Sequence, residues 1–298
     1  MATIVMTGAS SGFGAVAAER MVAQGARLIS GARGPAEVGA SIPVDLADLG
    51  SVREFAAAVR DRLDGAALDG LVLNAGLIRP DVDGRSADGF ETTFAVNHLA
   101  HYLLARLLLP ELADGATVVL TTSGTHDPAT GAGLAPPRHA DARLLAHPDR
   151  DPALDERPRK AGERAYTASK LCAVLTARSL SPLAPRATVL AYDPGQVFGT
   201  GLARDLALPL RTAWTILGVP VFGRALRTFS PTLNSRTAAG KTLADLALGN
   251  SPPPPSGSRY AALRRDRLTW GEPSNLARDE AVGRALWSDS AELVGWRD

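Results

Sequence analysis

The chain has 298 residues, of which 45% are hydrophobic and 21% charged, and its formal net charge is +1. This composition is typical of a globular protein that is long enough to bury a sizeable core. The near-zero charge argues against nucleic acid or an acidic partner, and the single cysteine, Cys172, excludes an internal disulfide. No signal peptide fits the first residues, and no apolar run is long enough to span a bilayer. We therefore expect a cytoplasmic protein with no transmembrane segment.

Seven short apolar runs are the predicted strands. They occupy residues 3–6, 27–30, 42–46, 70–74, 117–122, 188–192 and 259–263. Each of the first six precedes ten or more residues that can form a helix. Continuous runs rich in β-branched residues that alternate with helices are typical of parallel strands buried on both faces. The sequence thus predicts one α/β domain over 1–298, a doubly wound parallel sheet (Rossmann fold) of about seven strands that binds ligands at the carboxyl edge.

Two segments interrupt this alternation. Residues 124–163 are rich in proline, glycine and charge and are interpreted as an insertion, in which 140–148 predicts a short helix ended by Pro148. Residues 201–235 are apolar and rich in aromatic side chains, which indicates a binding segment for a small lipophilic substrate. A packed helix pair that closes the domain, or a shallow membrane contact made by the arginines of this segment, are the alternatives.

The first strand runs into "TGASSGFG", residues 7–14. A glycine turn between a strand and a helix can hold phosphate, because the helix N-terminal amides and the helix dipole favour an anion. Gly8 would permit the tight turn, Gly12 the approach of a pyrophosphate, and Gly14 the close packing of the helix. The spacing departs from the commoner Gly-x-Gly-xx-Gly fingerprint, so an ordinary glycine-rich turn is the alternative.

The second and third strands bear on the choice of cofactor. A carboxylate after the second strand would bind the adenosine ribose and exclude a 2′-phosphate. No acid lies between Ile29 and Gly34, and Arg33 offers a planar fork that suits a phosphate. These features favour NADP over NAD, although one arginine is also compatible with a solvated loop. Asp45, just past the third strand, could accept a hydrogen bond from the adenine amino group.

Polar side chains follow the later strands as well. Asn74 ends the fourth strand, and Ser123 ends the fifth, where in isolation it would be an ordinary turn serine. Asn97 lies inside a helical pattern, where it is either tolerated or holds an ordered water. Thr200 follows the sixth strand, from which it could bind a carboxamide.

Tyr166 and Lys170 are four residues apart in a helical pattern and so share one helix face. Lysine is rare here, with three among 32 basic residues. An ammonium about 4 Å from a phenol, at an effective dielectric of roughly 20, favours the phenolate by up to about three pKa units. The tyrosine pKa would then approach neutrality, where proton transfer is most efficient. A chance Tyr-xxx-Lys pair on an amphipathic helix is the alternative.

Taken in order, these motifs resemble the short-chain dehydrogenase/reductase family. The resemblance covers residues 3–202 and rests on "TGASSGFG" (7–14), "NAG" (74–76), Asn97, Ser123, "YTASK" (166–170) and "PG" (194–195). Each motif alone is weak, but one stands at each strand end. The stretch "FAVNHLAHYLL" (94–104) and the tail 277–295 resemble the retinol dehydrogenase and protochlorophyllide reductase-like branch of the family.

The resemblance implies a role for each catalytic residue. Tyr166 would be the general acid that protonates a carbonyl oxygen as a hydride arrives from the nicotinamide, and Ser123 would position the same oxygen. Lys170 would lower the tyrosine pKa and hold the nicotinamide ribose, while Asn97 would carry a water in the proton relay. The resemblance also implies that NADP(H) is lined by Gly8, Ser10, Ser11, Gly12, Phe13, Gly14, Arg33, Asp45, Leu46, Asn74, Ala75, Gly76, Tyr166, Lys170, Pro194, Gly195 and Thr200.

Two features depart from the family pattern. Ser123 and Tyr166 are 43 residues apart, more than in most members, and "PGQVFGTG" has one residue more than the usual motif, which leaves the assignment of Thr200 open.

We expect an NADP-dependent oxidoreductase acting on a lipophilic ketone or secondary alcohol. The alternatives are a carbon–carbon double-bond reductase like protochlorophyllide reductase and a non-catalytic NADP-binding sensor. Many family members form tetramers through the two long helices beginning near Asn97 and Tyr166. Because the insertion enters directly before the second of these helices, it would hinder that contact, and we expect a monomer or a homodimer.

Overall fold

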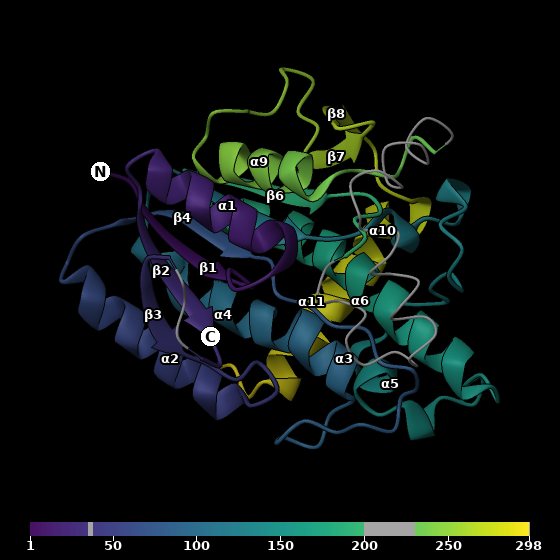
Figure 1. Ribbon diagram of the computed structural model, residues 1–298. Coiled ribbons are helices and arrows are strands. Elements are labelled where there is room, and N and C mark those ends of the chain that lie inside the picture. Colours follow the sequence, from purple (N-terminus) through teal and green to yellow (C-terminus); the bar gives the residue numbers. More distant parts are fainter. Residues whose placement is uncertain (35–37, 200–229, 298) are drawn as a thin grey trace.

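The computed structural model describes residues 1–34, 38–199 and 230–297, and these ranges contain one eight-stranded sheet (Figure 1). The spatial order is β3-β2-β1-β4-β5-β6-β7-β8. The strands are β1 (Thr3–Thr7), β2 (Arg27–Ala32), β3 (Ala40–Pro43), β4 (Leu68–Leu73), β5 (Leu112–Thr121), β6 (Thr188–Asp193), β7 (Tyr260–Arg264) and β8 (Arg267–Gly271). Strands β1 to β7 pair in parallel, as predicted for a doubly wound α/β fold.

The eighth strand was not predicted from the sequence. β8 pairs antiparallel with β7 at the edge of the sheet, and Arg265 and Asp266 form the turn between them, both in the left-handed region. Leu268 and Trp270 are half-buried, and the other residues of β8, Arg267, Thr269 and Gly271, are exposed. A five-residue edge strand with two half-buried side chains, joined by a turn without the usual glycine, leaves a weak pattern in the sequence.

The expectation of a helix after each of the first six strands is wrong for the second strand. Only seven residues, 33–39, separate β2 from β3, and those that the structure describes are not helical. β3 instead pairs directly with β2, with Ile29 opposite Ala40. The two strands are too close in the sequence for a helical crossover.

The helices cover both faces of the sheet. They are α1 (Gly12–Ala23), α2 (Leu49–Leu63), α3 (Thr92–Phe94), α4 (Ala100–Leu108), α5 (Ala142–Ala146), α6 (Pro158–Leu180), α9 (Arg236–Ala247), α10 (Asn275–Arg278) and α11 (Glu280–Leu293). A π-helical turn, Ala95–Leu99, joins α3 to α4. Short 3-10 turns lie at Leu109–Glu111, Gly124–His126, Pro128–Thr130, Pro148–Arg150 and Ser181–Leu183.

Two apolar clusters lie against the sheet, one on each face. α1 and α9 contribute to one cluster, into which Ile4 and Met6 of β1 point. α2, α4 and α6 contribute to the other, where Val5 of β1 is buried. Because successive strand residues point to opposite faces, burial on both sides requires the continuous apolar run from which β1 was predicted.

The stretch 124–163 is folded rather than extended. Its short helix α5 is followed by Pro148, as predicted for 140–148, and Asp141 caps the helix by accepting a hydrogen bond from the Leu144 amide. α6 begins at Pro158, so the last residues of this stretch belong to the helix that carries Tyr166. The insertion therefore leads directly into the helix of the site.

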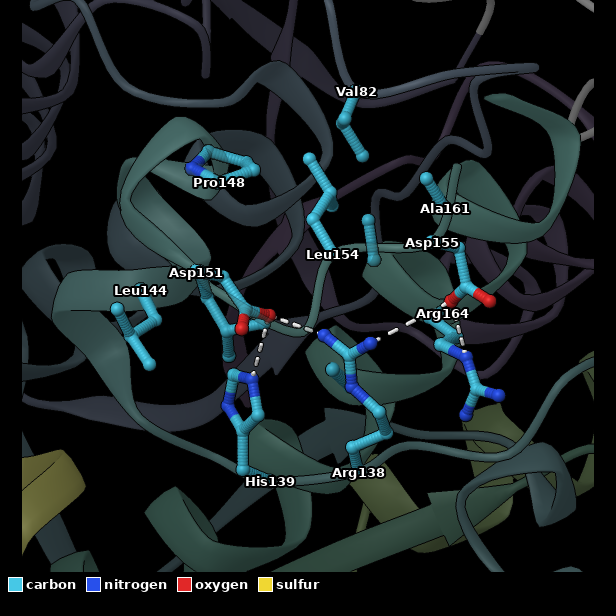
Figure 2. A pocket seen from close by; sticks show the side chains of 13 residues that line it. Val82, Arg138, His139, Leu144, Pro148, Asp151, Leu154, Asp155, Ala161 and Arg164 are labelled. Atoms are coloured by element: carbon cyan, nitrogen blue, oxygen red, sulfur yellow. Dashed lines mark hydrogen bonds and ion pairs between the residues drawn. The ribbon is translucent and has the colours of Figure 1, made fainter. Parts of the chain in front are cut away.

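Ion pairs hold the insertion against α6 (Figure 2). Arg138 pairs with Asp151 and lies 3.7 Å from Asp155, while His139 lies 3.4 Å from Asp151. Asp155 also pairs with Arg164 of α6 at 2.6 Å. These charged groups line a small cavity together with apolar side chains from the insertion, from α6 and from the loop after β4, namely Leu144, Leu145, Pro148, Leu154, Ala161, Ala165, Ala168 and Val82.

The C-terminal helix α11 packs against α6 and α5 and also contacts α4. The rings of Tyr102 on α4 and Trp287 on α11 meet edge to face, with centroids 4.8 Å apart. The guanidinium of Arg106 lies 5.1 Å from the Trp287 ring centre and 4.6 Å from that of Trp296. Within the described ranges, no helix is long and apolar enough to cross a membrane.

Candidate active site

The carboxyl ends of the parallel strands bring the motifs of the sequence to one edge of the sheet. Thr7 ends β1 opposite Leu73 of β4, and Thr121 ends β5 opposite Tyr192 of β6. The residues that follow each strand therefore meet. This register is why motifs more than a hundred residues apart in the chain form one site.

The turn after β1 depends on its glycines. Gly8 and Gly12 adopt φ values of +73° and +62°, which favour glycine. A Cβ on Gly8 would lie 2.8 Å from the Ala75 backbone, and a Cβ on Gly14 would overlap the Gly8 carbonyl oxygen. α1 begins at Gly12, and the side chain of the N-cap residue Ser11 makes no capping hydrogen bond. Amides at the start of α1 thus face a close-packed glycine turn, which fits a phosphate-bearing cofactor.

Asn74 connects three strand ends. Its Nδ2 donates to the Gly8 carbonyl at 3.1 Å, and its Oδ1 accepts from the Thr121 hydroxyl at 3.0 Å. The backbone amides of Asn74 and Ala75 donate to the Thr7 hydroxyl at 3.1 and 3.2 Å. The predicted "NAG" motif therefore braces the glycine turn against β4 and β5.

Asn97 lies in the π-helical turn that interrupts the long helix between α3 and α4. Its Oδ1 accepts from the Leu77 amide, and its Nδ2 donates to the Leu77 carbonyl and to the Ser169 hydroxyl, each at 2.9 Å. A Cβ on Gly76 would lie 3.3 Å from both Asn97 Oδ1 and Lys170 Nζ. The structure thus places Asn97 near the lysine, and its role in holding a water stays a prediction.

Ser123, Tyr166 and Lys170 meet between β5 and α6. The Ser123 hydroxyl acts on the Tyr166 phenol and favours its ionised form, which lowers the phenol pKa. Lys170 Nζ lies 5.7 Å from the centre of the tyrosine ring and donates to the Thr121 carbonyl at 3.2 Å. All three residues are more than nine-tenths buried, at 9%, 6% and 5% exposed.

The expectation that the tyrosine pKa approaches neutrality is wrong for this structure. Burial raises the pKa of Tyr166 above its ordinary value, and the Ser123 hydroxyl offsets only part of that rise. Burial also lowers the pKa of Lys170 to about 8. The cost of desolvating the phenolate therefore outweighs its attraction to the Lys170 ammonium, which lies 5.7 Å from the ring centre.

The remaining predicted cofactor residues lie around this edge. Arg33 is exposed directly after β2. Asp45 is exposed two residues after the end of β3, where its Oδ1 accepts from the Ala47 amide at 3.0 Å. Gly195 has a φ of +69°, and the Pro194 carbonyl accepts from Asn234 Nδ2 at 2.9 Å. Ser10 and Ser11 are exposed in the glycine turn, Phe13 is half-buried and Leu46 is buried. Thr200 and residues 201–229 of the predicted substrate segment lie outside the described residues.

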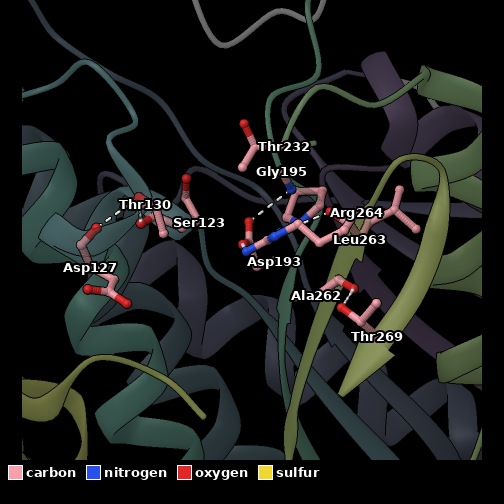
Figure 3. A network of polar contacts seen from close by, with 12 residues as sticks. Ser123, Asp127, Thr130, Asp193, Gly195, Thr232, Ala262, Leu263, Arg264 and Thr269 are labelled. Atoms are coloured by element: carbon pink, nitrogen blue, oxygen red, sulfur yellow. Dashed lines mark hydrogen bonds and ion pairs between the residues drawn. The ribbon is translucent and has the colours of Figure 1, made fainter. Parts of the chain in front are cut away.

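A buried polar group that was not predicted from the sequence lies beside these residues (Figure 3). Asp193, the last residue of β6, is 0% exposed and pairs with Arg264 of β7 at 2.7 Å. The Tyr260 hydroxyl donates to the same carboxylate at 3.3 Å. The sequence held one signal for this group, a charged residue at the end of an otherwise apolar strand and directly before "PG". Its partner lies 71 residues further on and leaves no local pattern.

A parallel sheet whose first strand turns through glycines into a helix defines the nucleotide-binding class of α/β proteins. Residues 2–132 match the family described as short chain dehydrogenase. Protochlorophyllide reductase A of rice is 31% identical to this chain over 98% of it and 80% of the relative. Human retinol dehydrogenase 13 is 32% identical over 98% of this chain and 84% of its own. The chain belongs to the short-chain dehydrogenase family of oxidoreductases, in the branch of these two relatives.

A solved structure agrees with this assignment. The 3-alpha-hydroxysteroid dehydrogenase from Pseudomonas sp. B-0831, complexed with NADH, superposes with a TM-score of 0.56 at 25% sequence identity, over 84% of this chain and 90% of its own. Its nicotinamide cofactor is the type that the family binds.

Proposed function

We propose that this protein is an NADP(H)-dependent oxidoreductase that transfers a hydride between the nicotinamide and a ketone or secondary alcohol of lipophilic character. The observation that carries the proposal is the meeting of Ser123, Tyr166 and Lys170 at the carboxyl edge of the sheet. These three groups supply a hydrogen-bond donor, a proton and a cation around one position. A sensor that only binds the cofactor needs none of them.

The nicotinamide, when bound, supplies or accepts the hydride. Tyr166 holds the proton at its Oη, and because burial raises the pKa of this phenol, it is protonated and ready to donate to a carbonyl oxygen. The Ser123 hydroxyl acts on the same phenol, so it can orient the same substrate oxygen. As Tyr166 gives up its proton, the hydroxyl of Ser123 and the ammonium of Lys170 stabilise the phenolate that remains.

The chain's own residues fit the cofactor. Gly8, Gly12 and Gly14 leave three positions of the turn at the start of α1 without a side chain, where a pyrophosphate is favoured. The choice of NADP over NAD is supported by the exposed Arg33 after β2 and by the absence of an acid between 29 and 34 in the sequence.

Reduction of a carbon–carbon double bond is the second candidate, and the 31% identity with protochlorophyllide reductase favours it. The same acid and cofactor would serve both reactions, since each needs a hydride and a proton. The lipophilic character of the substrate is inferred from the apolar sequence of 201–235.

A substrate panel distinguishes these functions. Consumption of NADPH is measured with lipophilic ketones, aldehydes and conjugated alkenes, on the wild type and on Tyr166→Phe. We expect turnover of carbonyl compounds that Tyr166→Phe abolishes while NADPH affinity is retained. Tyr102→Phe, which removes a buried hydroxyl from α4, is the matched control and should stay active. Turnover of alkenes alone would favour the second candidate, and tight NADPH binding without any turnover would favour the sensor.

A further inference from the structure

A buried carboxylate lies next to the proposed catalytic centre. Asp193 ends β6, and its Oδ1 accepts from the Gly195 amide at 2.8 Å. Its Oδ2 accepts from Arg264 Nη2 at 2.7 Å and from the Tyr260 hydroxyl at 3.3 Å. Figure 3 shows this group between Gly195 and Arg264, with Ser123 nearby. Asp193 is therefore tied both to the "PG" segment proposed to line the cofactor and to β7.

The carboxylate also touches the backbone beside Ser123. A Cβ on Gly124 would lie 3.0 Å from Asp193 Oδ2 and 3.6 Å from Arg264 Nη2. Gly124 follows Ser123 directly, and Asp193 raises the pKa of Tyr166 through its negative charge. The ion pair therefore lies against the segment that holds the serine, and its charge reaches the phenol.

A charged side chain that is shielded from solvent needs an ion-pair partner. Asp193 is fully buried, while the Arg264 side chain is 25% exposed. Removing one member of such a pair leaves the other charge uncompensated. An unpaired carboxylate here would oppose the negative charge that develops on the Tyr166 oxygen during proton transfer.

We infer that Arg264 is a positioning residue of the catalytic centre, which neutralises Asp193 so that Tyr166 can ionise while Asp193 holds the Gly195 segment. This inference rests on the proposed function, because it assigns the proton transfer to Tyr166. Arg264 acts through Asp193 and is not required to touch the substrate.

Other groups around Tyr166 also contribute to the electrostatic environment in which the Asp193–Arg264 pair acts. Lys170 faces the phenol from α6, and Ser123 faces it from the end of β5. His126 lies in the turn after Ser123, with its Nδ1 2.7 Å from the Ser123 carbonyl oxygen, and burial lowers its pKa, so it is neutral at neutral pH. Burial raises the pKa of Tyr260, which is also neutral. Among the described residues packed around the phenol, the charges are therefore Lys170, Asp193 and Arg264, with Asp127 further out beside His126.

The test is the pH dependence of kcat/KM for alcohol oxidation with NADP⁺, in which the rate rises with pH as the ionised fraction of Tyr166 grows. Because burial raises the pKa of Tyr166, the rising limb is compared rather than a plateau. We expect Arg264→Ala to move this rise to higher pH by about one unit, because the unpaired Asp193 carboxylate then opposes ionisation of the phenol. Asp193→Asn should move it to lower pH. Arg264→Lys, which keeps the charge, should leave it close to the wild type.

A matched control removes a cation from the same hairpin. Arg267 is exposed on β8, and Arg267→Ala should leave the pH profile unchanged. If Arg264→Ala and Asp193→Asn lower the rate without moving the profile in opposite directions, the pair is merely structural and the inference is wrong. If Arg264→Ala does not fold, the other two variants still test the inference. A charge effect shifts the pH profile of Asp193→Asn and leaves that of Arg264→Lys unshifted, and any other result overturns the inference.

A second measurement does not depend on turnover. Ionisation of Tyr166 is followed by tyrosinate absorbance on the NADP⁺ complex, as the difference between each protein and the same protein carrying Tyr166→Phe. The chain has four tyrosines, so one can be resolved by difference. A higher pKa in Arg264→Ala than in the wild type supports the inference even if no substrate is turned over, whereas an unchanged pKa overturns it.

Discussion

The hydroxyl oxygen of Thr7 lies 3.0 Å from Nε2 of His101, although the two residues are 94 positions apart. Because the Thr7 oxygen already accepts two backbone amides, its hydrogen points to Nε2. The ring proton of His101 is then on Nδ1, which lies 3.3 Å from the Asn97 carbonyl and donates to it. A neutral histidine thus joins the end of β1 to the π-helical turn of Asn97.

This arrangement predicts a loss of stability at mildly acidic pH. Burial lowers the pKa of both His98 and His101 from 6.5 to about 3. The unfolded chain therefore binds more protons between these values, so the stabilisation is complete above pH 6.5 and is lost as pH falls toward 3. We expect the free energy of unfolding, measured with urea, to fall by up to about 1.4 kcal/mol per pH unit for each histidine.

The control for the acid effect is His147, which is half-buried in the turn after α5. His147→Gln should leave the slope unchanged, while His101→Gln should reduce it. A free energy of unfolding that does not depend on pH across this window would contradict the buried neutral state of both histidines.

Gly14→Ala should damage both folding and cofactor binding. The added methyl would overlap the Gly8 carbonyl oxygen and press on Asn74. Overpacking of this kind lowers the free energy of unfolding by about 1–3 kcal/mol. Gly283→Ala, on the α11 helix, is the matched control because its methyl would have neighbours no closer than 3.7 Å. Thermal unfolding and NADPH titration of both variants measure the difference. Normal NADPH affinity in Gly14→Ala would show that the turn does not hold the cofactor.

The sequence predicted the strands well where burial on both faces demands a continuous apolar run, as in β1 and β4. It missed β8, because an exposed edge strand needs only Leu268 and Trp270 to pack. It also assumed a helix between β2 and β3, where the distance along the chain allows none. Local patterns therefore predicted the buried elements and failed at the edge and in the short connection.

The parts of the site that lie at the ends of strands were predictable from the sequence. Asn74, Ser123 and Lys170 come together because each follows or faces a strand end. The environment of Tyr166 was not predictable, since spacing along a helix indicates proximity to Lys170 but says nothing about burial, which dominates the pKa. The pair of Asp193 and Arg264 depends on two strands meeting in the sheet, which no single segment encodes.

Lys170→Arg keeps the positive charge, yet we expect it to reduce both NADPH affinity and turnover. Nζ is 3.2 Å from the Thr121 carbonyl and close to Gly76, so a buried guanidinium would have too little room and unpaired donors. We expect kcat/KM to fall at least about tenfold. Lys241→Arg on α9 is exposed and should behave as the wild type. Full activity in Lys170→Arg would show that the shape of the cation does not matter.

Arg33→Ala tests the choice of cofactor. The wild type should have a higher kcat/KM with NADPH than with NADH, and the variant should lose roughly tenfold or more with NADPH alone, since a hydrogen bond to a charged group contributes about 1.5–3 kcal/mol. Arg27 begins β2 at the opposite edge of the sheet and donates to the Arg62 carbonyl, so Arg27→Ala should keep the preference. A wild-type preference for NADH would refute the assignment of NADP.

The last prediction concerns assembly, where two elements cover the long helices. α11 packs against α6 and meets α4 through the Tyr102–Trp287 ring contact. The insertion adds to this cover, because Arg143 of α5 pairs with Asp289 and Glu292 of α11. A tetramer contact made by the outer faces of α4 and α6 would have to displace α11 and the groups that bind it.

We therefore expect a monomer or a homodimer in solution. Light scattering at micromolar concentration measures this directly against the 31.0 kDa mass of one chain. Arg143→Ala removes the link between α5 and α11 at the surface and should leave the mass unchanged, because the aromatic packing of α11 is retained. A stable particle of four chains in the wild type would contradict the prediction, since it would require a contact that α11 and the insertion leave no room for.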